Sequence, residues 1–109
     1  MNLNDYQEKA LLTASGRAKH NEFFHLVLGL VGESGEIAEK VKKLVRDHDS
    51  NLDKVDVDDL KKELGDVLWY VAVLADFFDL KLEDIAQANV DKLASRQKRG
   101  KLSGSGDNR

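Results

Sequence analysis

Two pairs of carboxylates, each spaced by three positions, are the strongest chemical signal in this sequence. They are Glu33 with Glu36 in LVGESGEIAEKV, and Glu63 with Asp66 in LKKELGDVLWYV. Residues three apart on an α-helix lie side by side, so each pair holds two like charges within about 5 to 6 Å. Both pairs border apolar stripes, and packing of these stripes would bring four carboxylates toward one site. Hard oxygen ligands of this kind suit Mg²⁺, with Mn²⁺ as a substitute.

The composition limits the classes of protein to consider. A chain of 109 residues without cysteine predicts one domain with neither disulfides nor thiolate metal sites. The net charge of −3, with scattered basic residues, predicts no binding of duplex nucleic acid. Since no long apolar span or signal-like start is present, we expect a cytoplasmic protein without a membrane partner.

Apolar residues at helical spacing, together with the absence of proline, predict an all-α, four-helix bundle-like subunit. The expected helices cover residues 4–14, 22–46, 56–78 and 82–98. We expect Asn4 and Gln7 to cap the first helix and Asp56 to cap the third. Residues 1–99 would form the helical domain, and residues 100–109 a flexible tail containing glycine and serine.

Two further helices carry stripes that we expect to face the core. The stripe on the second helix comprises Phe23, Val27, Leu30, Val31, Ile37, Ala38, Val41, Leu44 and Val45. The stripe on the fourth comprises Ile85, Ala86, Val90 and Leu93.

The third helix is apolar nearly all round between Val67 and Phe78, where Asp76 is the only charge. Such a helix must be buried on more than one side, which a four-helix monomer of this size cannot easily achieve. We therefore expect a homo-oligomer, a dimer or a tetramer, in which Trp69 and its neighbours meet a partner chain. Tyr70 follows Asp66 by four positions and so points to the side of the acidic pair, where it could stack on a base or sugar.

Glycines accompany the acidic residues. Gly29, Gly32 and Gly35 interrupt the second helix, and Gly65 lies between Glu63 and Asp66. A glycine in a helix interior costs about 0.5 to 1 kcal/mol relative to alanine. Two explanations remain open: close approach of another helix, or close approach of a ligand.

The arrangement of these motifs resembles a known family. The motif ESGE, then 26 residues, then ELGD followed by VLWYV is similar to the signature of the all-α nucleoside triphosphate pyrophosphohydrolases, in particular the small MazG-like branch. The likeness continues to NVDKLASRQKRGKLSGSGDNR and so covers most of the chain. It implies hydrolysis of nucleoside triphosphates, with deoxynucleotides favoured, to the monophosphate and pyrophosphate. It also implies that Mg²⁺ is held by the four acidic residues, which would then be the catalytic and metal-binding set.

The resemblance also implies substrate contacts on the fourth helix. Asn89, Lys92 and Arg96 form one polar stripe there. Lys92 and Arg96 would bind phosphate oxygens, while Asn89 would contact the sugar or base. Without the resemblance, such a stripe is more simply a solvated face. The glycine-rich tail, with Lys101 or Arg109, could close over phosphates, although we expect it to be disordered.

Two functions from different classes follow. The first is a magnesium-dependent nucleoside triphosphate pyrophosphohydrolase. The second is a noncatalytic helical oligomerisation or regulatory module whose acidic pairs bind a structural ion. In the first, Glu39 continues the spacing of Glu33 and Glu36 as a further ligand or base, or else is a solvated surface residue.

Overall fold

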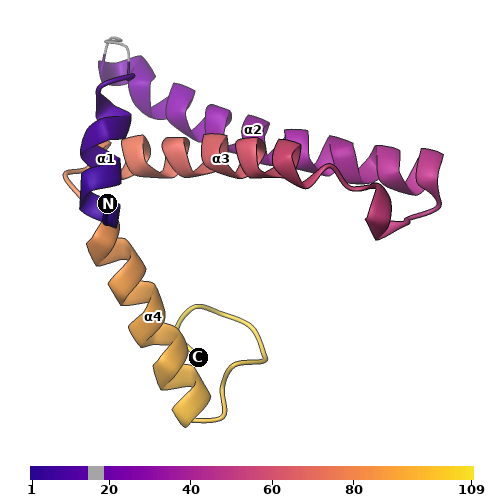
Figure 1. Ribbon diagram of the computed structural model, residues 1–109. Coiled ribbons are helices and arrows are strands. Elements are labelled where there is room, and N and C mark those ends of the chain that lie inside the picture. Colours follow the sequence, from indigo (N-terminus) through magenta and orange to yellow (C-terminus); the bar gives the residue numbers. More distant parts are fainter. Residues whose placement is uncertain (15–18) are drawn as a thin grey trace.

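The computed structural model describes residues 1–14 and 19–109, and within these ranges it contains helices and no strand (Figure 1). The elements are α1 (Leu3–Leu11), α2 (Lys19–His48), the short 3₁₀ helix η1 (Leu52–Lys54), α3 (Val57–Phe77) and α4 (Leu82–Lys98). The expectation of an all-α chain with four main helices is confirmed. None of the helices in these ranges is both long and apolar enough to cross a membrane.

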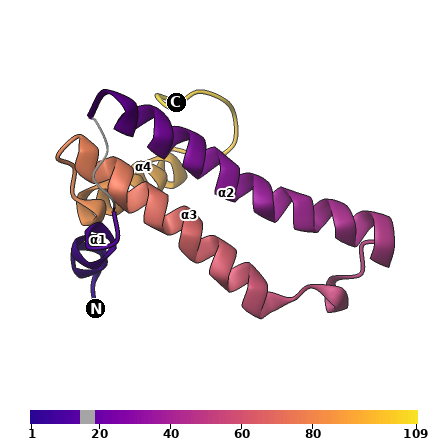
Figure 2. The same cartoon turned by 90° about the horizontal axis from the view of Figure 1, so that it is seen from above.

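Helices α2 and α3 form a long antiparallel hairpin, seen from above in Figure 2. Near the closed end, Lys40 of α2 pairs with Asp59 of α3. At the other end, the rings of Phe23 and Phe77 have centroids 6.1 Å apart. This register sets which residues of the two helices face each other.

Local capping signals explain where two helices begin. The Asp56 side chain accepts a hydrogen bond from the amide of Asp59, so the predicted cap of α3 is confirmed. The predicted capping pair of α1 is wrong: α1 starts at a capping box formed by Asn2 and Asp5. The same spacing of polar residues occurs at both places in the sequence, and the earlier pair closes the helix.

The core lies where α1 crosses the C-terminal half of α3. Its buried members are Ala10, Leu26, Ala72, Val73 and Leu82. Tight burial of small alanine and valine side chains lets the helices approach closely.

A buried glutamine, Gln7, ties α1 to the corner between α3 and α4. Its amide nitrogen donates to the main-chain oxygens of Ala72 (3.1 Å) and Leu80 (3.0 Å). Its side-chain oxygen accepts from the amide of Leu82 at 3.0 Å, within the unpaired first turn of α4. Gln7 therefore fixes the corner from which α4 departs, rather than capping α1.

The subunit is less compact than a globular domain of the same length. Its radius of gyration is 17.0 Å, whereas a compact domain of this size has about 13 Å. Its accessible surface of 8202 Å² exceeds by about 2,100 Å² the value expected for a monomer of this mass. The open shape arises because α4 leaves the hairpin at the α3 corner and runs away from it (Figure 1).

Several predicted core positions are exposed as a result. Val31, Val41 and Val45 of α2 are exposed, and so are Ile85, Val90 and Leu93 of α4. Leu26, which lies outside the predicted stripe, is buried, and no other α2 residue is buried among those whose side chains the structure describes. Amphipathic spacing identified faces that need cover, but a single copy of the chain does not provide it.

Trp69 makes two hydrogen bonds within its own subunit. Its indole nitrogen donates to the Thr13 hydroxyl at 2.8 Å and to the Ala10 main-chain oxygen at 3.2 Å. The ring therefore packs against α1 of the same chain, while the contact of the partly exposed Trp69 with a partner chain stays a prediction. Helices α1, α2 and α4 all contact α3, so much of its apolar surface is covered within one subunit.

Candidate metal and nucleotide site

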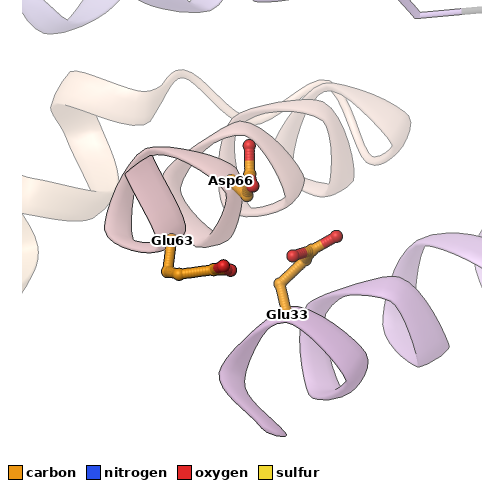
Figure 3. Close-up of side chains that lie close together, drawn as sticks. All are labelled: Glu33, Glu63 and Asp66. Atoms are coloured by element: carbon orange, nitrogen blue, oxygen red, sulfur yellow. The ribbon is translucent and has the colours of Figure 1, made fainter. Parts of the chain in front are cut away.

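Three carboxylates converge between α2 and α3. One oxygen from each of Glu33, Glu63 and Asp66 lies within 4.8 Å of the others (Figure 3). The hairpin register places Glu33 of α2 opposite the α3 turn that carries the other two. The fourth predicted ligand, Glu36, lies outside this group of three and is exposed.

Negative charge predominates in the cluster. The pKa of Glu33 is raised by partial burial and by the negative charges of Asp66, Glu63 and Glu36, in that order. Three partly screened anions at this distance repel each other, and a divalent cation would replace the repulsion by attraction. The donor set therefore fits a hard ion such as Mg²⁺ or Mn²⁺.

One ammonium group borders the cluster. Lys40 pairs with Asp59 at 2.5 Å and lies 3.6 Å from an oxygen of Glu63. Asp59 is itself held at the start of α3, where its amide is capped by Asp56. Lys40 thus neutralises part of the charge on the Glu63 side of the cluster.

Glu39 does not join the cluster. Its carboxylate pairs with Lys42 at 3.0 Å, one helical turn along α2. This contact lowers the pKa of Glu39. Of the two roles considered for this residue, the structure shows the solvated surface position.

A group of aromatic side chains lies about one helical turn from the acidic residues. The ring of Tyr70 lies against Gly29 of α2, where an added Cβ would come within 2.8 Å of the Tyr70 hydroxyl and closer still to the ring. His25 and Trp69 flank the same ring, with centroid distances of 6.3 and 4.9 Å. Gly29 is therefore required for close approach of the two helices.

The other three helical glycines have a different setting. A Cβ at Gly32, Gly35 or Gly65 would meet no atom within 4 Å. These glycines alternate with the acidic residues and leave open space around them. Within residues 1–14 and 19–109, no other helix of the subunit packs closely against these positions.

Tyr6 of α1 also lies in this region, although no motif in the sequence pointed to it. Burial, and then the charge of Asp66, raise the pKa of its phenol. Tyr6 and Asp66 are far apart in sequence and come together only when α1 crosses α3. Helical spacing from Tyr6 to Ala10 could have placed Tyr6 on the packed face of α1, but nothing in the sequence joined it to Asp66.

The predicted substrate residues of α4 are not brought to the acidic cluster within one chain. Helix α4 contacts α1 and α3 but, over the described residues, makes no close approach to α2. Asp66 precedes the end of α3 by 11 residues, which is about 16 Å of helix. Asn89, Lys92 and Arg96 thus lie on a separate arm of the molecule (Figure 1).

Comparisons with known proteins agree with these features. The model of the MazG nucleotide pyrophosphohydrolase domain matches residues 22–100. The chain is similar to the gene 37 protein of Mycobacterium phage L5, with 54% identity over 85 residues, 78% of this chain and 75% of that protein. It is also similar to the uncharacterized protein YvdC of Bacillus subtilis (strain 168), with 33% identity over 72 residues, 62% of this chain and 68% of that protein. No solved structure matches it. The match over residues 22–100 includes both acidic motifs and α4, and the chain belongs to the MazG nucleotide pyrophosphohydrolase family.

Proposed function

We propose that this protein hydrolyses nucleoside triphosphates, with deoxynucleotides favoured, to the monophosphate and pyrophosphate in a magnesium-dependent reaction in the cytoplasm. The convergence of Glu33, Glu63 and Asp66 carries the proposal. A triphosphate would be repelled by three carboxylates, so the cluster suits this substrate only with divalent cations between them.

The reaction adds water across one anhydride bond. A water oxygen bonds to the α-phosphorus, the bond to the oxygen bridging the α- and β-phosphates breaks, and pyrophosphate leaves. Bound Mg²⁺ would supply charge neutralisation and lower the pKa of the attacking water. Glu33, Glu63 and Asp66 would hold it, with Glu36 completing the set from one turn away.

The remaining proposed contacts position the nucleotide. Tyr70, one turn beyond Asp66, offers a ring face for a base or sugar. Asn89 and Lys92 of α4 would contact the sugar or base and the phosphates. Since α4 diverges from the hairpin, we propose that α4 of a second copy of the chain supplies these groups.

A homo-oligomer is supported by the shape of the subunit. The excess accessible surface is of the size that a stable protein interface buries. An open apolar groove of about 430 Å³ at the closed end of the hairpin also lacks cover in one subunit. Ile37, Val41, Leu44, Leu52 and Leu60 are among the residues that line it.

A pyrophosphate release assay tests the proposal. Canonical ribonucleotides and deoxyribonucleotides would be incubated with the protein, with Mg²⁺, with Mn²⁺, or with a chelator. We expect monophosphate and pyrophosphate in equal amounts, only with a divalent cation. Binding of the ion to the acidic cluster without hydrolysis of any nucleotide would favour the noncatalytic module instead.

A further inference from the structure

The glycine-rich tail is folded onto α4 by defined contacts. The Arg109 guanidinium donates hydrogen bonds to the main-chain oxygens of Lys101 (3.1 Å), Leu102 (2.9 Å) and Gly106 (2.7 Å). Gly104 and Gly106 have φ values of 114° and 87°, which favour glycine. Residues 101–109 therefore form a loop closed around the Arg109 side chain, and this guanidinium is engaged within the tail.

A second arginine anchors this loop to α4. Nη2 of Arg96 donates to the main-chain oxygen of Asp107 at 2.6 Å and to its Oδ1 at 3.1 Å. The ammonium of Lys92 donates to the same Oδ1 at 3.1 Å. One carboxylate oxygen thus bridges two cations that lie one helical turn apart and would otherwise repel each other.

The two cations differ in accessibility. Arg96 is only 4% exposed, and its Nε is buried without a hydrogen-bond partner among the described residues. The Lys92 side chain remains 38% exposed. With the tail closed, a phosphate in solution can reach Lys92, whereas the tail covers the Arg96 guanidinium.

We infer that Arg96 and Asp107 are positioning residues, in which Arg96 anchors the tail and Asp107 holds the Lys92 ammonium where it meets the nucleotide phosphates. Lys92 uses one N–H on Asp107 and keeps two for phosphate oxygens. This inference rests on the proposed function and changes the predicted role of Arg96 from a direct substrate contact to a support. It also gives the GSGDNR segment a purpose: its glycines and Arg109 shape the loop, and its aspartate reaches the helix.

Steady-state kinetics in two backgrounds test the inference. In the wild-type background, Asp107→Asn, Arg96→Met and Arg109→Met should each raise KM about fivefold to tenfold and change kcat less than twofold, because Lys92 loses its fixed position. Lys92→Met should raise KM by at least as much. In the Lys92→Met background, Asp107→Asn and Arg96→Met should have no further effect, because they act through Lys92. Lys98→Met, two residues beyond Arg96 on α4 and exposed, is the matched control and should match wild type.

Other outcomes would overturn the inference. A further rise in KM from Arg96→Met in the Lys92→Met background would show direct contact of Arg96 with substrate. A lower KM for Asp107→Asn would show that Asp107 competes with phosphate. Wild-type KM and kcat values for both Arg96→Met and Asp107→Asn would show that the tail has no role in catalysis.

Hydrogen exchange of the nucleotide-free protein separates this inference from the proposed function. Arg96→Met and Arg109→Met should both speed amide exchange in residues 101–109, and Lys98→Met should not. Since the hydrogen bonds of the Arg109 side chain all lie within the tail, its variant keeps the test valid if Arg96→Met fails to fold. Unchanged exchange in Arg109→Met would contradict a closed tail. If wild type hydrolyses no nucleotide while the exchange results hold, the proposed function fails and the anchoring stands.

Discussion

The two halves of α3 face different surroundings. In the C-terminal half, Ala72, Val73 and Ala75 are buried beneath the neighbouring helices. In the N-terminal half, Leu64 is 54% exposed, and the same turn carries Glu63 and Asp66. One half is stabilised within the subunit, while the other holds unbalanced charge and uncovered apolar surface. The difference shows that the packed residues and the clustered carboxylates occupy separate parts of a single helix.

The largest effect on catalysis should come from substitutions in the acidic half of α3, the N-terminal half that carries Glu63 and Asp66. Asp66→Asn removes one of three converging carboxylates. The transition state should then lose several kcal/mol of metal-dependent stabilisation, which should lower the rate of pyrophosphate release at least about a thousandfold. Glu36→Gln, outside the group of three, should cost about tenfold. Thermal unfolding without metal should occur at the wild-type temperature or higher, because like-charge repulsion is relieved. Equal losses in both variants would contradict the distinction between these ligands.

Loss of a contact to the packed, C-terminal half of α3 should lower the stability of the folded protein. Gln7→Leu leaves the buried amide of Leu82 without its acceptor and removes the side-chain donor from the carbonyls of Ala72 and Leu80, so we expect the free energy of unfolding to fall by about 2 kcal/mol or more. Chemical denaturation measures this change. Glu8→Gln, exposed on the next position of α1, is the control and should differ from wild type by less than about 0.5 kcal/mol. A stable Gln7→Leu protein would show that α1 is not needed to fix the corner.

The exposed Leu64 in the acidic half of α3 should affect only the association of subunits. If a second copy covers it, Leu64→Ser should weaken association by about 1 to 2 kcal/mol through lost apolar burial, measured by sedimentation equilibrium at micromolar concentration. Leu12→Ser changes a leucine that is also exposed but lies just beyond α1, and should leave association unchanged. A wild-type monomer at these concentrations would remove the proposed interface.

The smallest effect concerns the tail. Hydrogen bonds from Lys92 and then Arg96 lower the pKa of Asp107. Since the folded-state value lies below the ordinary one, the stabilising contact is complete above about pH 4 and is lost as the pH falls through the lowered value. Amide chemical shifts of Gly104 and Gly106 should therefore stay constant near pH 5 and change only below the usual range of aspartate. A transition above pH 5 would oppose the assignment, and Asp107→Asn should abolish the transition.

Local signals predicted the elements well. The start of α3 follows from the Asp56 side chain, and the start of α4 at Leu82 was expected as found. Where two polar pairs had the same spacing, as at the start of α1, the sequence did not decide between them. The exposed face of α4 shows a further limit, because amphipathic spacing reveals that a face is apolar but not which chain covers it.

The site could be predicted only as far as spacing within a helix determines it. The spacing of three from Glu63 to Asp66 places them together on any helix, but their approach to Glu33 depends on the hairpin register. Tyr6 and Asp107 reach their partners through helix crossing and loop closure, which residue spacing does not encode.

The bonds made by Gln7 also have a consequence for the order of folding. They join residues separated by 65 to 75 positions, whereas α2 and α3 are neighbours in the chain. Local contacts form faster because less loop-closure entropy opposes them. During synthesis α2 and α3 can therefore pair before α4 has been made. Helix α1 can dock fully only after Leu82 has been added, because the Leu82 amide is the donor to the Gln7 side-chain oxygen. The acidic residues would then already lie face to face in a chain whose N-terminal helix is still undocked.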